Sequence, residues 1–317
     1  MMQTHDTLAS LRAQLRQWRR DGASVGFVPT MGNLHAGHFA LVELARKHAD
    51  KVVASIFVNP TQFGPNEDYA LYPRTPQRDI DALAAHKCDA LFLPDVEQMY
   101  PFGTMGCVQM HVPGITDILC GAHRPGHFNG VAQVVARLFN MVQPDLAVFG
   151  RKDYQQLQVI RYMTREMSFP VEIIPAPTLR EADGLAMSSR NQYLQGDERQ
   201  TATRIYQTLL FMRDAARQGL PVAGIEDEAV ARLEAAGFSV DYAEVRRGDL
   251  TRAKSPDEGI PVLTVDEEIY RRLPALLIAT VDKFAQMPWN GRTQMLFGQV
   301  DGYCPRHGFT SPCMEDA

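Results

Sequence analysis

The sequence predicts an α/β protein: a doubly wound parallel sheet with a second, smaller α+β domain after it. Short runs of β-branched and apolar residues recur along the first half, and stretches of helical character separate most of them. These runs are 24–28, 51–58, 89–93, 145–149 and 171–174. Parallel strands need crossover connections, which are usually helices, so this alternation indicates a sheet covered on both faces.

The first elements can be assigned in order. Residues 7–20 are expected to form a helix, because apolar side chains repeat there at helical spacing, at Leu8, Leu11, Leu15 and Trp18. The strand at 24–28 leads through a glycine-containing turn into a helix that begins near His38. In parallel sheets ligands bind beyond the carboxyl ends of the strands. Motifs that directly follow a strand therefore carry most weight.

The pattern changes after about residue 182. Two helices, at about 197–219 and 224–236, precede strands expected at 238–246, 261–265 and 275–281. The segment 175–186 mixes Pro, Gly and charge, as hinges often do. We therefore expect a first domain at 1–182 and a second at 183–317, whose last twenty or so residues are poorly ordered.

Composition restricts the class of protein. The 317 residues suggest two domains at roughly 150 residues each. Thirty-two basic and 37 acidic side chains give a net charge of -5, which provides no global field for nucleic acid or anionic lipid. No apolar run approaches the roughly 18 residues of a membrane span, and the N-terminus is too charged for a signal peptide. These features predict a cytoplasmic enzyme or binding protein without nucleic-acid or membrane partners.

The cysteines do not predict a structural role. Their number is five and they are scattered, which is not the pattern of a disulfide framework. Cys304, His307 and Cys313 are metal-capable, but no second pair at zinc-finger spacing accompanies them. A structural metal there is not favoured.

The most informative segment is FVPTMGNLHAGHFALVELARKH, residues 27–48. It places a strand end, a turn and a helix start in succession, and a helix N-terminus attracts anions. His35 and His38 are three residues apart with Gly37 between them, so two imidazoles can flank a phosphate. Two surface histidines at a helix start are the simpler interpretation of an isolated H-x-x-H. The position after a strand, on a turn with Gly32 and Gly37, favours an anion site.

This segment also resembles a known family. HAGH is similar to the HIGH motif of the nucleotidyltransferase superfamily, and PTMGNLHAGH resembles the pantothenate synthetases, the pantoate–β-alanine ligase family. The resemblance covers residues 7–250 and continues through SIFVNPTQF, YPRT, RPGHFNGV, FGRKDYQQL and READGLAMSSRNQYL. It implies a Rossmann-like first domain and a homodimer.

The resemblance implies a specific reaction. The family condenses (R)-pantoate with β-alanine, consumes ATP with Mg²⁺, and releases AMP and diphosphate through a pantoyl-adenylate. His35 and His38 would then stabilise charge on the α-phosphate, with His38 the better candidate for proton donation. Lys152, Ser188, Ser189 and Arg190 would hold the phosphates.

Further residues are implied to bind ATP. They come from the turn after the first strand, from the end of the strand at 145–149, and from the segment around the proposed hinge. They are Pro29, Thr30, Met31, Gly32, Asn33, Leu34, Ala36, Gly37, Gly150, Arg151, Asp153, Leu179 and Met187. Taken alone, Lys152-Asp153 would be a solvated helix start and SSRN a helix-capping turn.

The substrate residues are implied in the same way. Gln62, just past the strand at 51–58, and Gln156 would hold pantoate, together with Met31, Asn59, Tyr72 and Arg124. A loop glutamine is otherwise usually solvent-facing, and surface charge is an equal alternative for Arg124. Asn129 could cap the helix that follows it. The loop from Gly64 to Pro76 resembles the active-site gate of the family.

Two departures from the family pattern concern the metal. Arg151 stands where the family usually has Glu, and Gln77-Arg78 replace acidic residues that commonly follow YPRT. Only Asp79 then remains to contact Mg²⁺. Beyond about residue 250 the chain is longer than the usual ending of the family, and residues 288–313 resemble nothing in it.

Two alternatives stay open. The first is another HxGH nucleotidyltransferase, one that adenylylates a phosphate monoester and would yield a dinucleotide product. The second is a non-catalytic ATP-binding protein in which Arg151 and Arg78 have silenced the site.

Overall fold

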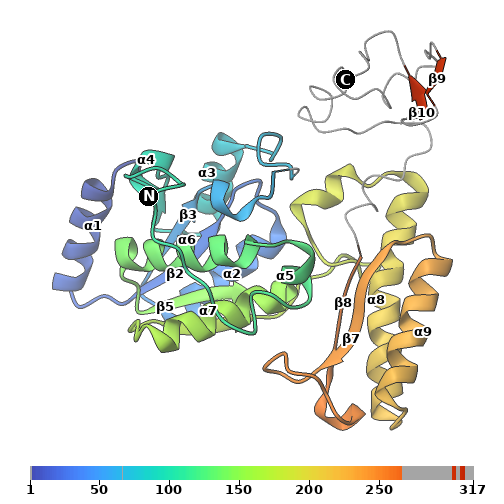
Figure 1. Cartoon of the computed structure of the whole chain (residues 1–317). Coiled ribbons are helices and arrows are strands. Elements are labelled where there is room, and N and C mark those ends of the chain that lie inside the picture. The colour runs from blue at the N-terminus through green and yellow to red at the C-terminus, as the bar shows by residue number, and fades with distance from the viewer. Residues whose placement is uncertain (1, 66, 266–301, 305–307, 311–317) are drawn as a thin grey trace. The chain divides into compact units, whose positions relative to one another are not determined.

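The computed structural model describes residues 2–65, 67–265, 302–304 and 308–310 (Figure 1). The chain forms two compact units: residues 1–64 with 73–272, and residues 65–72 with 273–317. The predicted domain boundary near residue 182 falls inside the first unit and stays a prediction. The strand expected at 275–281 lies outside the described residues.

The centre of the first unit is a parallel sheet of six strands in the order β1-β4-β3-β2-β5-β6. The strands are β1 Gln3–His5, β2 Val25–Thr30, β3 Lys51–Ile56, β4 Ala90–Phe92, β5 Leu146–Gly150 and β6 Glu172–Ala176. The five predicted strands of this sheet are confirmed, and β1 was missed because three residues show no alternation. The order runs outward from β2 in both directions, so the topology switches between β2 and β5, where ligands bind in such sheets.

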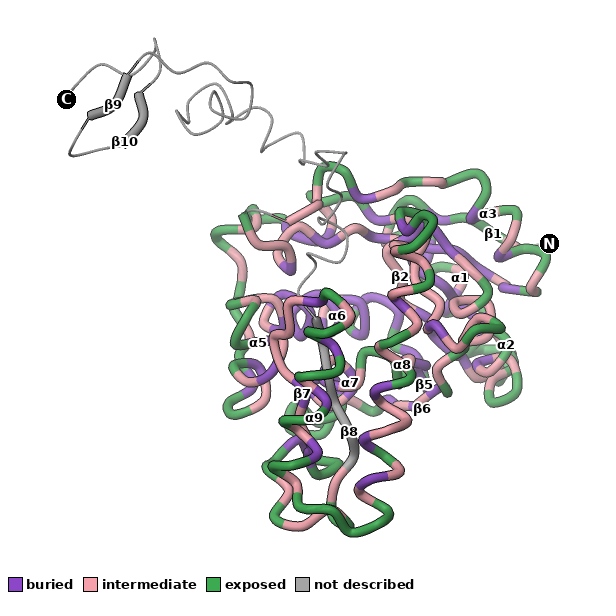
Figure 2. The backbone as a smooth tube through the Cα atoms, turned by 90° about the vertical axis from the view of Figure 1, so that its right-hand side faces the viewer, coloured by how far each residue is buried: buried purple, intermediate pink, exposed green. Residues whose placement is uncertain are grey.

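Successive residues of β2 point to opposite faces of the sheet, as the twofold period of a strand requires. Val25 and Phe27 join one core cluster, and Val28 joins the other. Figure 2 shows buried residues concentrated along these strands. Helices α1 Leu8–Arg20, α6 His127–Val142 and α7 Tyr154–Glu166 supply the first cluster, and α2 Ala36–His48 and α3 Pro76–Ala85 supply the second.

The first helix confirms its prediction. Thr7 is the N-cap of α1, and its hydroxyl accepts a hydrogen bond from the backbone N–H of Ser10. Leu11, Leu15 and Trp18 are buried on one face. Two short helices, α4 Val96–Met99 and α5 Cys120–His123, were not predicted; each has only four residues, too few to show a period.

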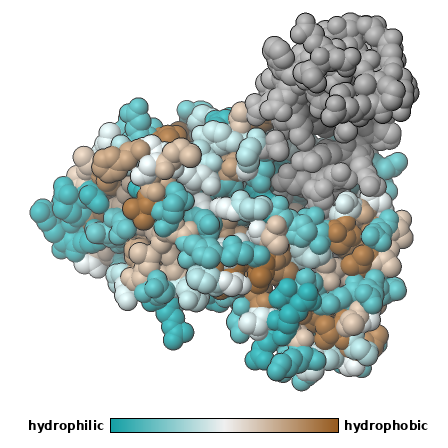
Figure 3. All heavy atoms as spheres, in the orientation of Figure 1, coloured by the Kyte–Doolittle hydropathy of each residue, from teal (hydrophilic) through white to brown (hydrophobic). Residues whose placement is uncertain are grey.

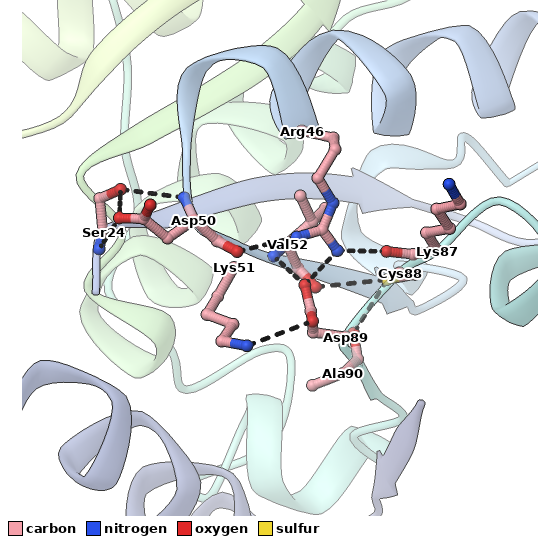
Figure 4. A network of polar contacts seen from close by, with 9 residues as sticks. All are labelled: Ser24, Arg46, Asp50, Lys51, Val52, Lys87, Cys88, Asp89 and Ala90. Carbon is pink, nitrogen blue, oxygen red and sulfur yellow. Dashed lines mark hydrogen bonds and ion pairs between the residues drawn. The ribbon is translucent and has the colours of Figure 1, made fainter. Parts of the chain in front are cut away.

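The N-terminal ends of β3 and β4 are held by a polar network (Figure 4). The carboxylate of Asp89 accepts a 2.8 Å hydrogen bond from the backbone N–H of Val52 and pairs with Arg46 and Lys51. This network lies at the end of the strands opposite to the motifs named above. The network therefore stabilises the pairing of β3 with β4 and takes no part in ligand binding at the other end of the strands.

The remaining described part of the first unit is a helical hairpin on an antiparallel strand pair. It contains α8 Gly196–Arg217, α9 Val222–Ala235, β7 Val240–Arg246 and β8 Ile260–Val265. The two predicted helices and the two described strands are confirmed. In the C-terminal segment predicted to be poorly ordered, β9 Gly302–Cys304 and β10 Gly308–Thr310 form an antiparallel pair, and the rest, with His307 and Cys313, lies outside the described residues.

Within the described residues, no helix is both long and apolar enough to cross a bilayer. The face drawn in Figure 3 is mostly hydrophilic, with hydrophobic side chains scattered over it. Helix α1 buries one side against a core and carries charged side chains on the other, whereas α6 is buried over most of its length.

Candidate active site

The turn after β2 has a backbone conformation that its sequence explains. Gly32 has φ +87°, and a Cβ there would lie 3.3 Å from a carboxylate oxygen of Asp79. Asn33 is also left-handed, at φ 49°. Asp79 is 1% exposed, and its two oxygens accept hydrogen bonds from the backbone N–H groups of Asn33 and Leu34, each 2.9 Å long. The turn is thus held from α3 by a buried carboxylate.

These contacts do not favour Asp79 as a Mg²⁺ ligand, and its metal role stays a prediction. A metal ligand must present an oxygen to the site, whereas both oxygens of Asp79 face backbone donors inside the protein. The sequence suggested a metal ligand because Asp79 is the acidic residue left after YPRT. The local signal gives no information about which way the carboxylate points.

The helix α2 begins at Ala36, with His35 as its N-cap, so His38 lies in the first turn and not at the predicted start. The backbone N–H of Gly37 donates to Nδ1 of His35 at 3.1 Å. The backbone N–H of His35 donates to Nδ1 of His38 at 3.3 Å. A backbone N–H can only donate, so both Nδ1 atoms are acceptors and both rings carry their proton on Nε2. Each histidine therefore keeps one N–H donor for a ligand.

The surroundings of His35 and His38 favour their neutral rings. Burial first, and then the neighbouring His35 and Lys152, lower the pKa of His38 to about 3. Burial and Lys152 also lower the pKa of His35. A neutral ring has no extra proton to give near neutral pH. The role of His38 as proton donor stays a prediction, and its Nε2–H is available as a hydrogen-bond donor.

The end of β5 brings a cation to the same place. Arg151–Asp153 form the 3-10 turn η2 after Gly150, and α7 begins at Tyr154, as predicted for a helix start. Lys152 lies 3.4 Å from Asp153 and acts electrostatically on both His35 and His38. Lys152 lowers the pKa of Asp153, with further contributions from His127 and Arg190. The Asp153 side chain is 59% exposed, so its cationic neighbours rather than burial determine this direction.

The segment after the proposed hinge reaches the turn after β2. Ser188 is the N-cap of the 3-10 helix η3 Ser189–Tyr193 and accepts from the backbone N–H of Arg190, so the simpler capping interpretation of SSRN is also met. The hydroxyl of Ser189 donates to the backbone carbonyl of Asn33 at 3.0 Å. Met187 lies beside Gly37, at 3.6 Å from the position of a Cβ there. Its backbone N–H is paired with the carbonyl of Leu179.

Two of the predicted substrate residues form a buried pair after β3. Asn59 is 1% exposed and caps the 3-10 turn η1 Pro60–Gln62, and Gln62 is 9% exposed. Nδ2 of Asn59 donates to Oε1 of Gln62 at 3.1 Å. Nε2 of Gln62 points to the sulfur of Met31 at 3.2 Å. Gln62 is thus not a solvent-facing loop residue.

Helix α6 also contacts the turn η1 that contains Gln62. Nδ1 of His127 donates to the backbone carbonyl of Gln62 at 2.8 Å, and Nε2 of His127 lies 3.3 Å from Arg124. Sequence reasoning missed His127, although its place in RPGHFNGV was a signal. Asn129 is not the predicted helix cap: Gly126 is the N-cap of α6, and Asn129 is its third residue.

The two adjacent glutamines of α7 have different surroundings. Nε2 of Gln155 donates to two backbone carbonyls, those of Ile115 and Ile118, each at 2.7 Å. Within the described part of the chain, the side chain of Gln156 has no hydrogen-bond partner. That difference is consistent with the choice of Gln156 as the ligand-binding residue. Tyr72 belongs to the second compact unit, and its role stays a prediction, as does the gate proposed for residues 64–76.

Comparison with known proteins decides the family. The family model described as pantoate-beta-alanine ligase matches residues 3–271. The chain belongs to the pantoate–β-alanine ligase family. The extension beyond residue 271 lies outside this match.

Similar ligases include the pantothenate synthetase of Xanthomonas oryzae pv. oryzae (strain MAFF 311018), 57% identical over 84% of this chain and 95% of that protein. The pantothenate synthetase of Stenotrophomonas maltophilia (strain K279a) is 59% identical over 79% of this chain and 90% of that protein.

Two solved ligases have the same fold. A pantothenate synthetase from Thermus thermophilus has a TM-score of 0.75 at 50% identity, with 80% of this chain and 91% of that chain covered. The pantoate-beta-alanine ligase from Francisella tularensis, solved with beta-gamma ATP and beta-alanine, has a TM-score of 0.68 at 34% identity, with 77% and 89% covered. The predicted Rossmann-like fold is confirmed by these neighbours.

Proposed function

We propose that the chain catalyses the ATP-dependent condensation of (R)-pantoate with β-alanine to give pantothenate, AMP and diphosphate. The family membership supports this, as does the solved relative from Francisella tularensis with its nucleotide and β-alanine. The observation on which the proposal rests is the pair of Nε2–H donors on His35 and His38, next to Lys152 at the switch between β2 and β5.

The reaction has two balanced steps. A carboxylate oxygen of pantoate attacks the α-phosphorus of ATP, the bond to the bridging oxygen breaks, and diphosphate leaves. The amine of β-alanine then attacks the acyl carbon of the pantoyl-adenylate, loses a proton, and displaces AMP. The residues position the reactants and stabilise charge, and no covalent enzyme intermediate is required.

The binding roles follow from the arrangement described above. His35 and His38 donate hydrogen bonds to the α-phosphate, where charge develops. Lys152 and the turn Ser188–Arg190 hold the other phosphates, because both lie next to the segment that carries the two histidines. The remaining nucleotide residues named from the sequence come from β2 and the turn after it, from the end of β5 and, for Leu179 and Met187, from the segment after β6. Pantoate is bound by Gln62, Asn59, Met31, Gln156 and Arg124.

Mg²⁺ is proposed as the companion of ATP, where it neutralises phosphate charge. Mg²⁺ usually takes one or two carboxylates and completes its shell with phosphate oxygens and water. The described residues contain no group of three candidate ligands, which suits a metal held mostly by the nucleotide. Asp153 is an accessible carboxylate beside Lys152 and is the better candidate to hold the ion.

A homodimer and a cytoplasmic location are proposed as well. The apolar side chains of Phe102, Met105 and Val108 are 85%, 95% and 77% exposed, and a second subunit would remove such surface from water. Sedimentation tests the assembly: a single species near 35 kDa at micromolar concentration would contradict it.

One experiment tests the function. The purified full chain is given ATP, Mg²⁺, pantoate and β-alanine, and AMP and pantothenate are measured. Equal amounts of both products are expected. A dinucleotide product from a phosphate monoester would favour the other HxGH nucleotidyltransferase. Failure to trap pantoyl-adenylate in a single turnover without β-alanine would favour the non-catalytic ATP-binding protein.

A further inference from the structure

Tyr100 is a buried residue that the proposed mechanism does not use. It follows the short helix α4, is 2% exposed, and its ring has the guanidinium of Arg137 5.0 Å from its centroid. Burial raises the pKa of Tyr100, so its hydroxyl stays protonated in the range where the enzyme works. Oη of Tyr100 donates to Oδ1 of Asn59 at 2.6 Å, a short bond between two buried groups.

The direction of each hydrogen bond around Asn59 follows from its partners. The backbone N–H of Thr61 can only donate, and it points at Oδ1 of Asn59 at 3.4 Å. The backbone carbonyl of Gly130 can only accept, and it lies 3.2 Å from Nδ2 of Asn59. These two backbone groups determine which end of the amide is oxygen. Tyr100 must then donate to Asn59.

The same logic extends to Gln62. Nδ2 of Asn59 is a donor, so the atom of Gln62 that faces it, at 3.1 Å, must be the carbonyl oxygen Oε1. The amide nitrogen of Gln62 is left on the other side, directed at the sulfur of Met31, a weak acceptor. A ligand oxygen would be a better partner for that nitrogen than the thioether.

We propose that Tyr100 is a positioning residue that acts through Asn59 to present the amide nitrogen of Gln62 to an oxygen atom of pantoate. This inference rests on the proposed function, since pantoate is the ligand. The hydroxyl of Tyr100 also lies 3.1 Å from the hydroxyl of Thr61, which itself donates to Oδ1 of Asn59 at 3.1 Å. Both contacts of Tyr100 therefore converge on Asn59, whose amide orients Gln62.

The first test is Tyr100→Phe, which removes the hydroxyl and keeps the ring. The KM for pantoate is expected to rise about tenfold, because a buried acceptor loses its best donor, while the KM for ATP stays unchanged. Tyr162→Phe on α7 is the control: it removes the hydroxyl of a tyrosine that is 46% exposed and takes no part in the contacts of the 59–62 turn. The control should leave both KM values unchanged.

A double-mutant cycle separates positioning from general stability. If Tyr100 acts through Gln62, Tyr100→Phe should raise the KM for pantoate in the parent protein and have no further effect in Gln62→Ala. Independent, multiplying effects of the two substitutions would overturn the inference. A lower melting temperature with an unchanged pantoate KM would do the same.

A second variant reverses the direction of the hydrogen bond between Asn59 and Gln62. Asn59→Asp places an acceptor opposite Oε1 of Gln62, so the Gln62 amide should rotate and present its oxygen to pantoate. The crystal structures of Asn59→Asp and Tyr100→Phe should show a reoriented or multiply placed Gln62. An unmoved Gln62 in both would overturn the inference. If the parent protein makes no pantothenate while Gln62 moves as expected, the proposed function fails and the positioning role of Tyr100 stands.

Discussion

The backbone of His35 holds the ring of His38 in one tautomer, because its N–H donates to Nδ1 of His38 at 3.3 Å, and the backbone N–H of Gly37 does the same for His35. The two rings lie 4.2 Å apart between centroids and are tilted by 47°. The capping bonds of helix α2 therefore also prepare the two donors of the site. In both rings Nδ1 accepts the hydrogen bond that stabilises the helix start, and Nε2–H remains for the proposed contact with phosphate.

The first prediction concerns His38. His38→Ala should slow pantoate-dependent diphosphate release about a hundredfold or more, since one preorganised donor is lost, with less effect on ATP binding. His38→Gln should retain more activity, because its amide nitrogen can replace the Nε2–H donor. His111→Ala, at an exposed histidine paired with Asp117, is the control. An unchanged rate in His38→Ala would refute the assignment.

The second prediction concerns acid stability. The pKa of His38 is about 3 in the folded chain and ordinarily 6.5, so between these values the unfolded chain binds a proton that the folded chain does not. The stability from the neutral ring is complete above pH 6.5 and is lost as the pH falls toward 3. Urea denaturation at several pH values should show a smaller acid-induced loss in His38→Gln. Parallel curves for the two proteins would contradict the low pKa.

The third prediction separates the two roles considered for Asp79. Asp79→Asn replaces one carboxylate oxygen by an NH₂ group that faces a backbone N–H, so the free energy of unfolding should fall by about 1–3 kcal/mol. The Mg²⁺ concentration for half-maximal activity should not change. Asp81→Asn, on the same helix and bonded to exposed Gln77, is the control and should be nearly neutral. A large shift in the Mg²⁺ requirement of Asp79→Asn would restore the metal role.

The fourth prediction concerns Gly130 in helix α6. A Cβ there would lie 2.4 Å from the carbonyl oxygen of Thr61, so Gly130→Ala must displace the turn that carries Gln62. We expect a loss of about 1–3 kcal/mol in thermal unfolding, with a higher KM for pantoate. Gly224→Ala, also within a helix but with open space at its Cβ, should instead stabilise by up to about 1 kcal/mol. Equal behaviour of the two variants would show that the close approach has no consequence.

Local order along the chain was enough to predict the layers of the protein. The alternation of strands and helices predicted the five main strands, because apolar residues recur with the period of the element that they form, two for a strand and 3.6 for a helix. HAGH after the first strand predicted where an anion would bind, since a helix N-terminus attracts negative charge whatever surrounds it.

Contacts between distant residues set the chemistry within that site. The low pKa of His38 comes first from burial, then from the neighbouring His35 and from Lys152. Burial and Lys152, which is 114 positions away in the chain, have no local signal in the sequence. The inward turn of Asp79 and the relay from Tyr100 to Gln62 likewise depend on which groups face each other after folding. Protonation state and hydrogen-bond direction are properties of pairs in space, so they are set only when the chain brings those pairs together.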